Sequence, residues 1–134
     1  MIQENVKKVL NENLWYIATC NDEGSEPNVV PVGFKRVCDD VKLAIGAVLL
    51  ETTLENIKAN GRVAVACANP VTGEAYQIKG TAELVYEGDA YEHYRKLTED
   101  TFKGAPELKC AVIITPERLI NSSPNERNKE EIPL

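Results

Sequence analysis

The sequence has a single histidine, and its few cysteines are too scattered to form a metal site. Cys20, Cys38, Cys67 and Cys110 include no C-x-x-C pair, and His93 has no second histidine to share a ligand set. We therefore expect no metal site. We interpret the cysteines as free thiols packed mostly in strands.

Long apolar runs are also absent. The longest, from Val41 to Leu50, contains Lys42 and is about half as long as the roughly 20 residues of a membrane-spanning helix. The first five residues lack the basic region and apolar run of a secretory signal. We therefore expect a cytoplasmic protein with no membrane partner.

The chain has no excess of positive charge. Its 15 Lys and Arg residues against 21 Asp and Glu residues give a net charge of -6, which argues against nucleic acid as the main partner. At 134 residues, 43% of them hydrophobic, the chain is the size of one globular domain with one core.

Motifs of protein-borne catalysis are missing as well. There is no G-x-S-x-G elbow, Walker loop, G-x-G-x-x-G turn or H-E-x-x-H helix, and His93 lies on the solvated face of a predicted helix. If the protein is an enzyme, we expect a cofactor to supply the chemistry.

Hydrophobic periodicity predicts a mainly β domain with few helices. Ile2, Val6, Val9 and Leu10 recur at helical spacing. Further helices are predicted over 51–61 and 89–100, and strands over 14–20, 28–37, 41–47, 62–68, 75–86 and 108–115, with a bulge at Gly80. Six strands with mostly tight connections favour an antiparallel barrel of Greek-key type over residues 1–120. The polar tail, 121–134, is expected to be extended or disordered.

The strongest local signal is the start of the second helix. Thr52 followed by Glu55 fits a capping box, and Asn60-Gly61 fits a left-handed helix end. A helix start presents unpaired N–H groups and partial positive charge, which suit a phosphate. Capping and phosphate binding compete for some of the same N–H groups, and both interpretations stay open here.

Three stretches, in this order and at this spacing, resemble a known family. They are LWYIATCNDEGSEPNVVPVGF at 14–34, TTLENIKANGRVAVA at 52–66 and YQIKGTAE at 76–83. Together with the element order over residues 1–120, they resemble the FMN-binding split barrels related to pyridoxamine 5'-phosphate oxidase, especially the small single-domain flavin-binding members.

The resemblance implies a six-stranded split barrel that forms a homodimer and holds FMN in clefts between subunits. It places part of the second strand beside the flavin ring and the start of the second helix at the phosphate. Lys35 would add positive charge, and Gln77 projects from the fifth strand, either toward the cleft or as an ordinary exposed residue. The implied cofactor-binding residues are Val30, Pro31, Val32, Gly33, Lys35, Ala47, Thr52, Thr53, Asn56 and Gln77.

The chain departs from the family at one position that matters. Many relatives carry Lys or Arg just before the helix threonine, where this chain has Glu51. A phosphate dianion would lose a charge-assisted contact worth roughly 1.5–3 kcal/mol. Candidates for a compensating cation are Lys35, Lys58, Arg62 and Lys79. FMN binding is then weak, or the ligand differs.

The resemblance favours an FMN-dependent oxidoreductase that passes electrons or hydride to or from a small redox partner. Three alternatives stay open: a flavin carrier or storage protein, a barrel that binds haem or the deazaflavin F420, and a purely structural dimer. The substrate cannot be inferred from the residues.

Overall fold

The computed structural model describes the whole chain, residues 1–134, as three helices and eight strands. The helices are α1 (Glu4–Glu12), α2 (Thr52–Asn60) and α3 (Asp89–Phe102). The strands are β1 (Trp15–Cys20), β2 (Pro27–Val32), β3 (Lys35–Cys38), β4 (Lys42–Ala47), β5 (Arg62–Ala68), β6 (Ala75–Val85), β7 (Cys110–Asn121) and β8 (Glu131–Ile132). None of the helices is long and apolar enough to cross a membrane.

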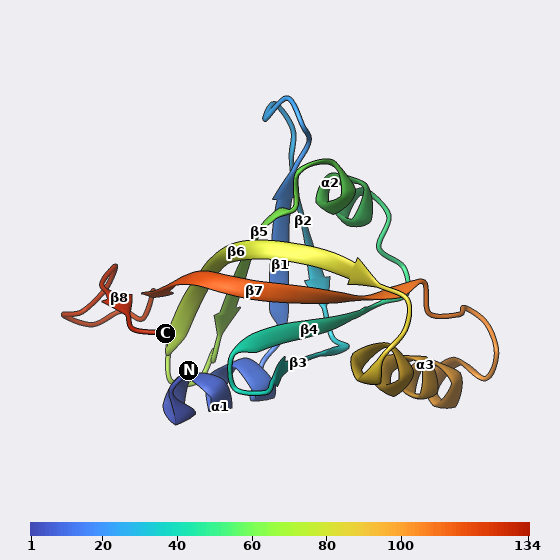
Figure 1. Cartoon of the computed structure of the whole chain (residues 1–134). Helices are drawn as coiled ribbons and strands as arrows, with labels where there is room; N and C mark the ends of the chain where they lie inside the picture. Colours follow the sequence, from blue (N-terminus) through green and yellow to red (C-terminus); the bar gives the residue numbers. More distant parts are fainter.

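The strands form one antiparallel sheet in the order β2-β1-β5-β6-β7-β4-β3, with β8 paired to β7. The sheet curls around the core, and its two ends, β2 and β3, do not pair with each other (Figure 1). This confirms the prediction of a mainly β, antiparallel split barrel. The number of strands differs from six because one predicted strand is divided and β8 is added.

The predicted strand over 28–37 is wrong as a single element. It breaks at Gly33 and Phe34 into β2 and β3, which lie at opposite ends of the sheet order. Phe34 still contacts the sheet, because its carbonyl accepts a hydrogen bond from the amide of Gly46 at 2.8 Å. The break places the residues between β2 and β3 at the split of the barrel.

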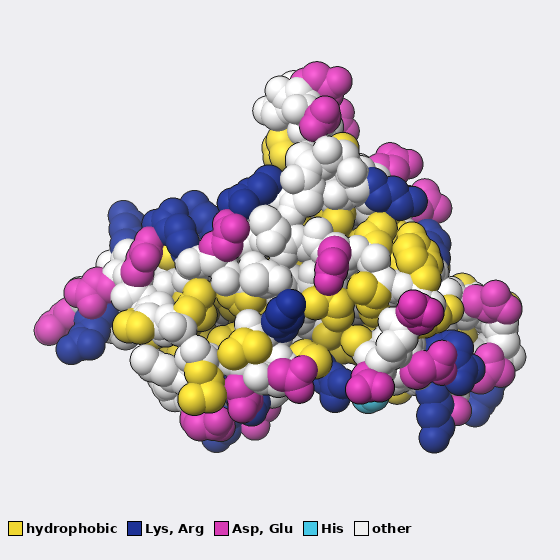
Figure 2. Space-filling view, in the orientation of Figure 1, with side chains coloured by type: hydrophobic (Ala, Val, Ile, Leu, Met, Phe, Trp, Pro, Cys, Tyr) yellow, Lys and Arg dark blue, Asp and Glu magenta, His cyan; other side chains and the backbone are white.

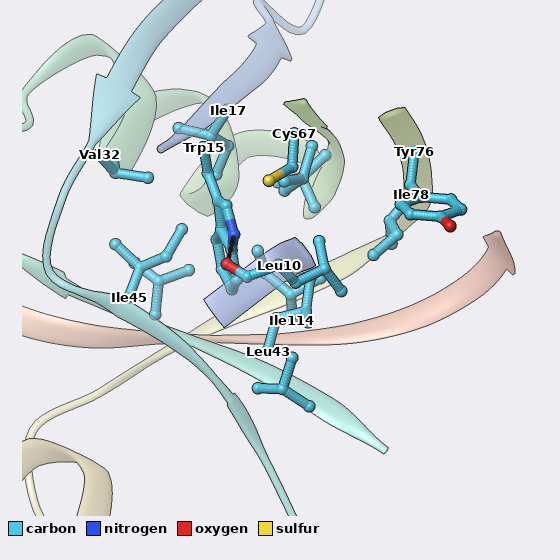
Figure 3. Packing of buried hydrophobic residues seen from close by; sticks show 14 of the residues in the cluster. Leu10, Trp15, Ile17, Val32, Leu43, Ile45, Cys67, Tyr76, Ile78 and Ile114 are labelled. Atoms are coloured by element: carbon cyan, nitrogen blue, oxygen red, sulfur yellow. Dashed lines mark hydrogen bonds between the residues drawn. The ribbon is translucent and has the colours of Figure 1, made fainter. Parts of the chain in front are cut away.

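The core fills the inside of the curled sheet, and α1 closes one end of it (Figure 1). Val6, Val9 and Leu10 of α1 are buried, as the spacing predicts. Trp15 is fully buried and donates its indole N–H to the carbonyl of Leu10 at 2.7 Å (Figure 3). Trp15 therefore joins β1 to the end of α1.

On the outside of the sheet, α3 packs against β4 and β7. Tyr94 lies flat on Gly46, where an added Cβ would come within 2.7 Å of the Tyr94 ring. Gly46 is therefore required for the close packing of α3 on β4.

Apolar side chains gather on the surface between α2 and α3, where β6 ends and β7 begins (Figure 2).

The predicted bulge is confirmed. The register between β6 and β7 shifts between Lys79 and Gly80, and a Cβ at Gly80 would lie 2.2 Å from the backbone oxygen of Thr115. The bend allows the long strands β6 and β7 to follow the curve of the barrel.

The C-terminal residues are ordered by hydrogen bonds, although most of them are exposed, and they include the short strand β8 paired to β7. Strand β7 continues six residues beyond the predicted end at Thr115. Asn121 and Ser123 are buried, and the side chain of Asn121 bonds to Asn125 and to the carbonyl of Arg127. Polar composition suggested a solvated tail, but here the polar side chains bond to one another and to the backbone.

Candidate functional site

The two edges of the sheet differ in what covers them. At β3, the amide of Val37 donates to Oδ1 of Asn11 at 2.9 Å, so α1 and the residues near it cover part of this edge. Strand β2 has no strand on its other side. An edge strand offers unpaired backbone groups to a ligand, and the prolines at 27 and 31 oppose the addition of another strand.

A shallow apolar hollow of about 250 Å³ lies where β2 ends. Val32 and Gly33, both predicted to flank a flavin ring, line it together with side chains that the sequence did not identify. The additional lining residues are Phe34, Gly46, Val48, Leu49 and Phe102. Leu49 is 75% exposed and, with its apolar neighbours in the lining, forms a continuous apolar surface of the kind that marks a contact site. In the sequence, the apolar run Val48-Leu49-Leu50 between a strand and a helix was the feature that could have indicated this apolar surface.

The start of α2 differs from the predicted capping box. Thr52 is the first helical residue and not the N-cap, because Glu51 occupies the cap position and makes no side-chain cap hydrogen bond. The predicted left-handed end is confirmed, since Gly61 has φ of 69° and its amide bonds to the carbonyl of Ile57 at 2.8 Å.

Two of the predicted phosphate ligands point into the protein. Thr53 is 1% exposed, and its Oγ1 accepts a hydrogen bond from Asn28 Nδ2 at 3.2 Å. Asn56 is 6% exposed, and its Nδ2 donates to Thr19 Oγ1 at 3.0 Å. These side chains attach α2 to β2 and β1. Of the three polar side chains predicted on α2, only Thr52 is exposed.

Lys35 is also engaged elsewhere. Its ammonium donates to the carbonyls of Leu10 and Asn11, at 2.7 and 3.1 Å, and lies 5.3 Å from the centre of the Trp15 ring. Burial lowers the pKa of Lys35, while the neighbouring Cys67 has the opposite, smaller effect. A cation at this place satisfies the C-terminal carbonyls of α1. The structure therefore gives Lys35 a role at α1.

The remaining predicted residues divide between the inside and the outside of the barrel. Val30 packs against the core and Ala47 is fully buried, whereas Pro31 is exposed. Gln77 of β6 pairs with Ala66 of β5, which pairs with Tyr16 of β1, and Tyr16 pairs with Pro31 of β2. These four residues form one row across the outer face of the sheet. Gln77 also lines a groove of about 550 Å³ at this outer face. The structure thus brings Val32 and Gly33 together and places Gln77 on another surface.

The charges around the start of α2 are balanced. Glu51 occupies the cap position, and the ammonium of Lys109 donates to the neighbouring carbonyl of Leu50 at 2.8 Å. Of the candidate compensating cations, Arg62 pairs with Glu117 at 2.9 Å. Lys58 lies in the last turn of α2, at the other end of the helix, so Glu51 and Lys109 together leave no net positive charge at the helix start.

The thiols do not line the hollow at the end of β2: Cys67 and Cys110 lie in the core, and Cys20 and Cys38 are half-buried. All four cysteines are free and lie in strands, as predicted. Burial raises the pKa of Cys67 and Cys110, which keeps them protonated. No group of three His, Cys, Asp or Glu side chains is arranged to hold a metal ion.

The curled antiparallel sheet, with its unpaired edges at β2 and β3, defines a split barrel. The family model described as pyridoxamine 5'-phosphate oxidase matches residues 2–126. The chain therefore belongs to this family of split barrels, whose members include flavin-binding proteins.

Solved structures agree with this assignment. HupZ of Group A Streptococcus is 27% identical, with a TM-score of 0.83 over 99% of this chain and 100% of that one. A putative pyridoxamine 5'-phosphate oxidase from Lactobacillus delbrueckii is 26% identical, with a TM-score of 0.71 over 89% and 93% of the two chains. An FMN-binding protein from Syntrophomonas wolfei, 14% identical, shares the fold with a TM-score of 0.69 over 89% and 80%. Among curated proteins, no sequence matches the chain.

Proposed function

We propose that this chain holds the isoalloxazine ring of FMN or a related flavin in a seam between two subunits, and passes electrons or hydride between that ring and a small partner. The observation that carries the proposal is the apolar hollow at the end of β2, beside the open edge of that strand. A flat heteroaromatic ring needs such a combination of apolar surface and backbone hydrogen-bonding groups. Family membership supports the same ligand class.

The residues present fit the ring end of a flavin. Val32, Gly33 and Leu49 would hold it against the apolar surface, and backbone groups of β2 would orient its polar edge. The bound flavin would supply the capacity for one-electron or hydride transfer. The side chains of Val48 and Phe102 would exclude water from one side of the hollow.

We propose a second copy of the chain as the other wall of the seam. The outer face of β2, β1, β5 and β6 exposes Leu14 (46%), Tyr16 (49%) and Val29 (62%), with Ala66 between the strands. An apolar face of this kind favours association. In such a dimer Gln77, which lies in the same row on the outer face, would lie at the interface between the subunits and not in the hollow at the end of β2.

The experiment combines sedimentation with flavin titration. Wild-type protein is expected to sediment as a dimer at micromolar concentration and to quench flavin fluorescence on binding. Tyr16→Glu should give a monomer whose flavin affinity falls about tenfold or more, because a carboxylate would be buried unpaired in the seam. The matched control is Val71→Glu, at a 91% exposed position in the turn between β5 and β6.

Two outcomes contradict the proposal. A monomer that retains flavin would exclude the shared seam, and a protein that stays colourless after exposure to flavins would exclude the ligand.

An absorption spectrum of the purified protein would identify a bound haem or deazaflavin in place of a flavin. Turnover of NADH or NADPH with simple acceptors distinguishes a reductase from an electron carrier.

A further inference from the structure

The start of α2 does not fit a phosphate dianion, although the neighbouring hollow fits a ring. Thr53 and Asn56 are 1% and 6% exposed, and both bond to barrel residues, Thr53 to Asn28 and Asn56 to Thr19. A phosphate cannot reach them without breaking two buried hydrogen bonds. The accessible donors are the hydroxyl of Thr52 and the first amides of the helix.

Those remaining donors already have an anion beside them. Glu51 is the N-cap residue, and although its exposed side chain makes no cap hydrogen bond, its carboxylate is within side-chain reach of the positive end of the α2 dipole. A carboxylate near a helix start is stabilised there and repels a second anion. The ammonium of Lys109, which donates to the carbonyl of Leu50, carries one positive charge, and the carboxylate of Glu51 carries one negative charge. Together they leave this segment with no positive surplus. The chain as a whole carries a net charge of -6, which adds to the repulsion of an anion.

We infer that this chain gains no affinity from the terminal phosphate of a flavin, so that it does not prefer FMN to riboflavin. The inference rests on the proposed function, because it concerns the same cleft. Glu51 is then a specificity-determining residue: it disfavours the phosphorylated form without contacting the ring.

The test compares riboflavin and FMN by fluorescence titration, in 50 mM and 300 mM salt. For the wild type we expect dissociation constants that agree within about threefold, with FMN the weaker ligand at low salt, since screening reduces the repulsion at high salt. Glu51→Lys should tighten FMN binding about tenfold and change riboflavin binding by less than about twofold. Glu51→Gln, which preserves shape, should tighten FMN binding about threefold.

The control is Glu126→Lys, which makes the same change in net charge on an exposed residue of the C-terminal segment. It should leave both affinities within about twofold. Wild-type preference for FMN of more than about threefold would overturn the inference and leave flavin binding intact. Riboflavin binding with no gain of FMN affinity in either Glu51 variant would overturn the role of Glu51. Failure of both ligands to bind would overturn the inference together with the proposed function.

Discussion

Substitution of Asn56 tests whether the buried polar side chains of α2 stabilise the fold or bind a ligand. Its side chain is buried, and its amide donates to Thr19 Oγ1 at 3.0 Å, so Asn56→Ala removes this bond and leaves a small cavity. The lost hydrogen bond costs about 1 kcal/mol and the cavity about another 1 kcal/mol, which gives about 2 kcal/mol in total. We expect this loss in the free energy of unfolding.

The loss can be expressed as a melting temperature. For 134 residues the entropy of unfolding is about 0.28 kcal/mol/K, so a loss of about 2 kcal/mol lowers the melting temperature by about 7 °C. The measurement is thermal unfolding by circular dichroism at one fixed protein concentration, because a dimer melts at a concentration-dependent temperature. Thr52→Ala, on an exposed side chain of the same helix, should shift the melting temperature by less than about 2 °C.

A double-mutant cycle with Thr19→Val isolates the bond between the two side chains. We expect a coupling of about 1 kcal/mol between residues 19 and 56. At 25 °C, where the variants are folded, riboflavin affinity should stay within about twofold of the wild type. Unchanged melting together with a tenfold loss of affinity would refute the reasoning, since Asn56 would then contact the ligand.

Two further predictions concern other buried polar groups. Lys35→Met should lower the free energy of unfolding, measured in urea, by about 1–2 kcal/mol, because two carbonyls of α1 lose their charged donor. Flavin affinity should not change. Loss of flavin affinity with unchanged stability would show that Lys35 binds the ligand. Burial raises the pKa of Tyr94 to about 12, so between pH 10 and 12 the unfolded chain loses this proton first and stability falls as pH rises. Tyr94→Phe should cost about 1 kcal/mol at pH 8, through its bond to the carbonyl of Ala44, and should flatten that alkaline decline in urea titrations; an equally steep decline would contradict the assignment.

The sequence was sufficient to predict the class of fold because its signals are local and periodic. The apolar spacing of α1, the strand-forming residues of β1 and the Asn60-Gly61 helix end each correspond to the observed element. The break at Gly33 was not predictable from periodicity, because the residues of β2 and β3 both favour a strand. Only their pairing with different strands places them at opposite ends of the sheet. The order of the C-terminal segment was missed for a similar reason: its polar groups bond to one another and to the backbone only after the chain folds.

The candidate site shows the same limit at the level of single side chains. Thr52, Thr53 and Asn56 have the residue types of an anion site, and spacing alone does not say which of them face the ligand. The burial of Thr53 and Asn56 follows from partners 25 and 37 residues away in the sequence, Asn28 and Thr19, which no local pattern indicates. The sequence alone showed Glu51 as a departure from the family pattern. The structure places this residue at the start of α2, where its negative charge disfavours a bound phosphate. In this chain the residue that differs from its relatives is therefore more informative about the ligand than the residues that agree with them.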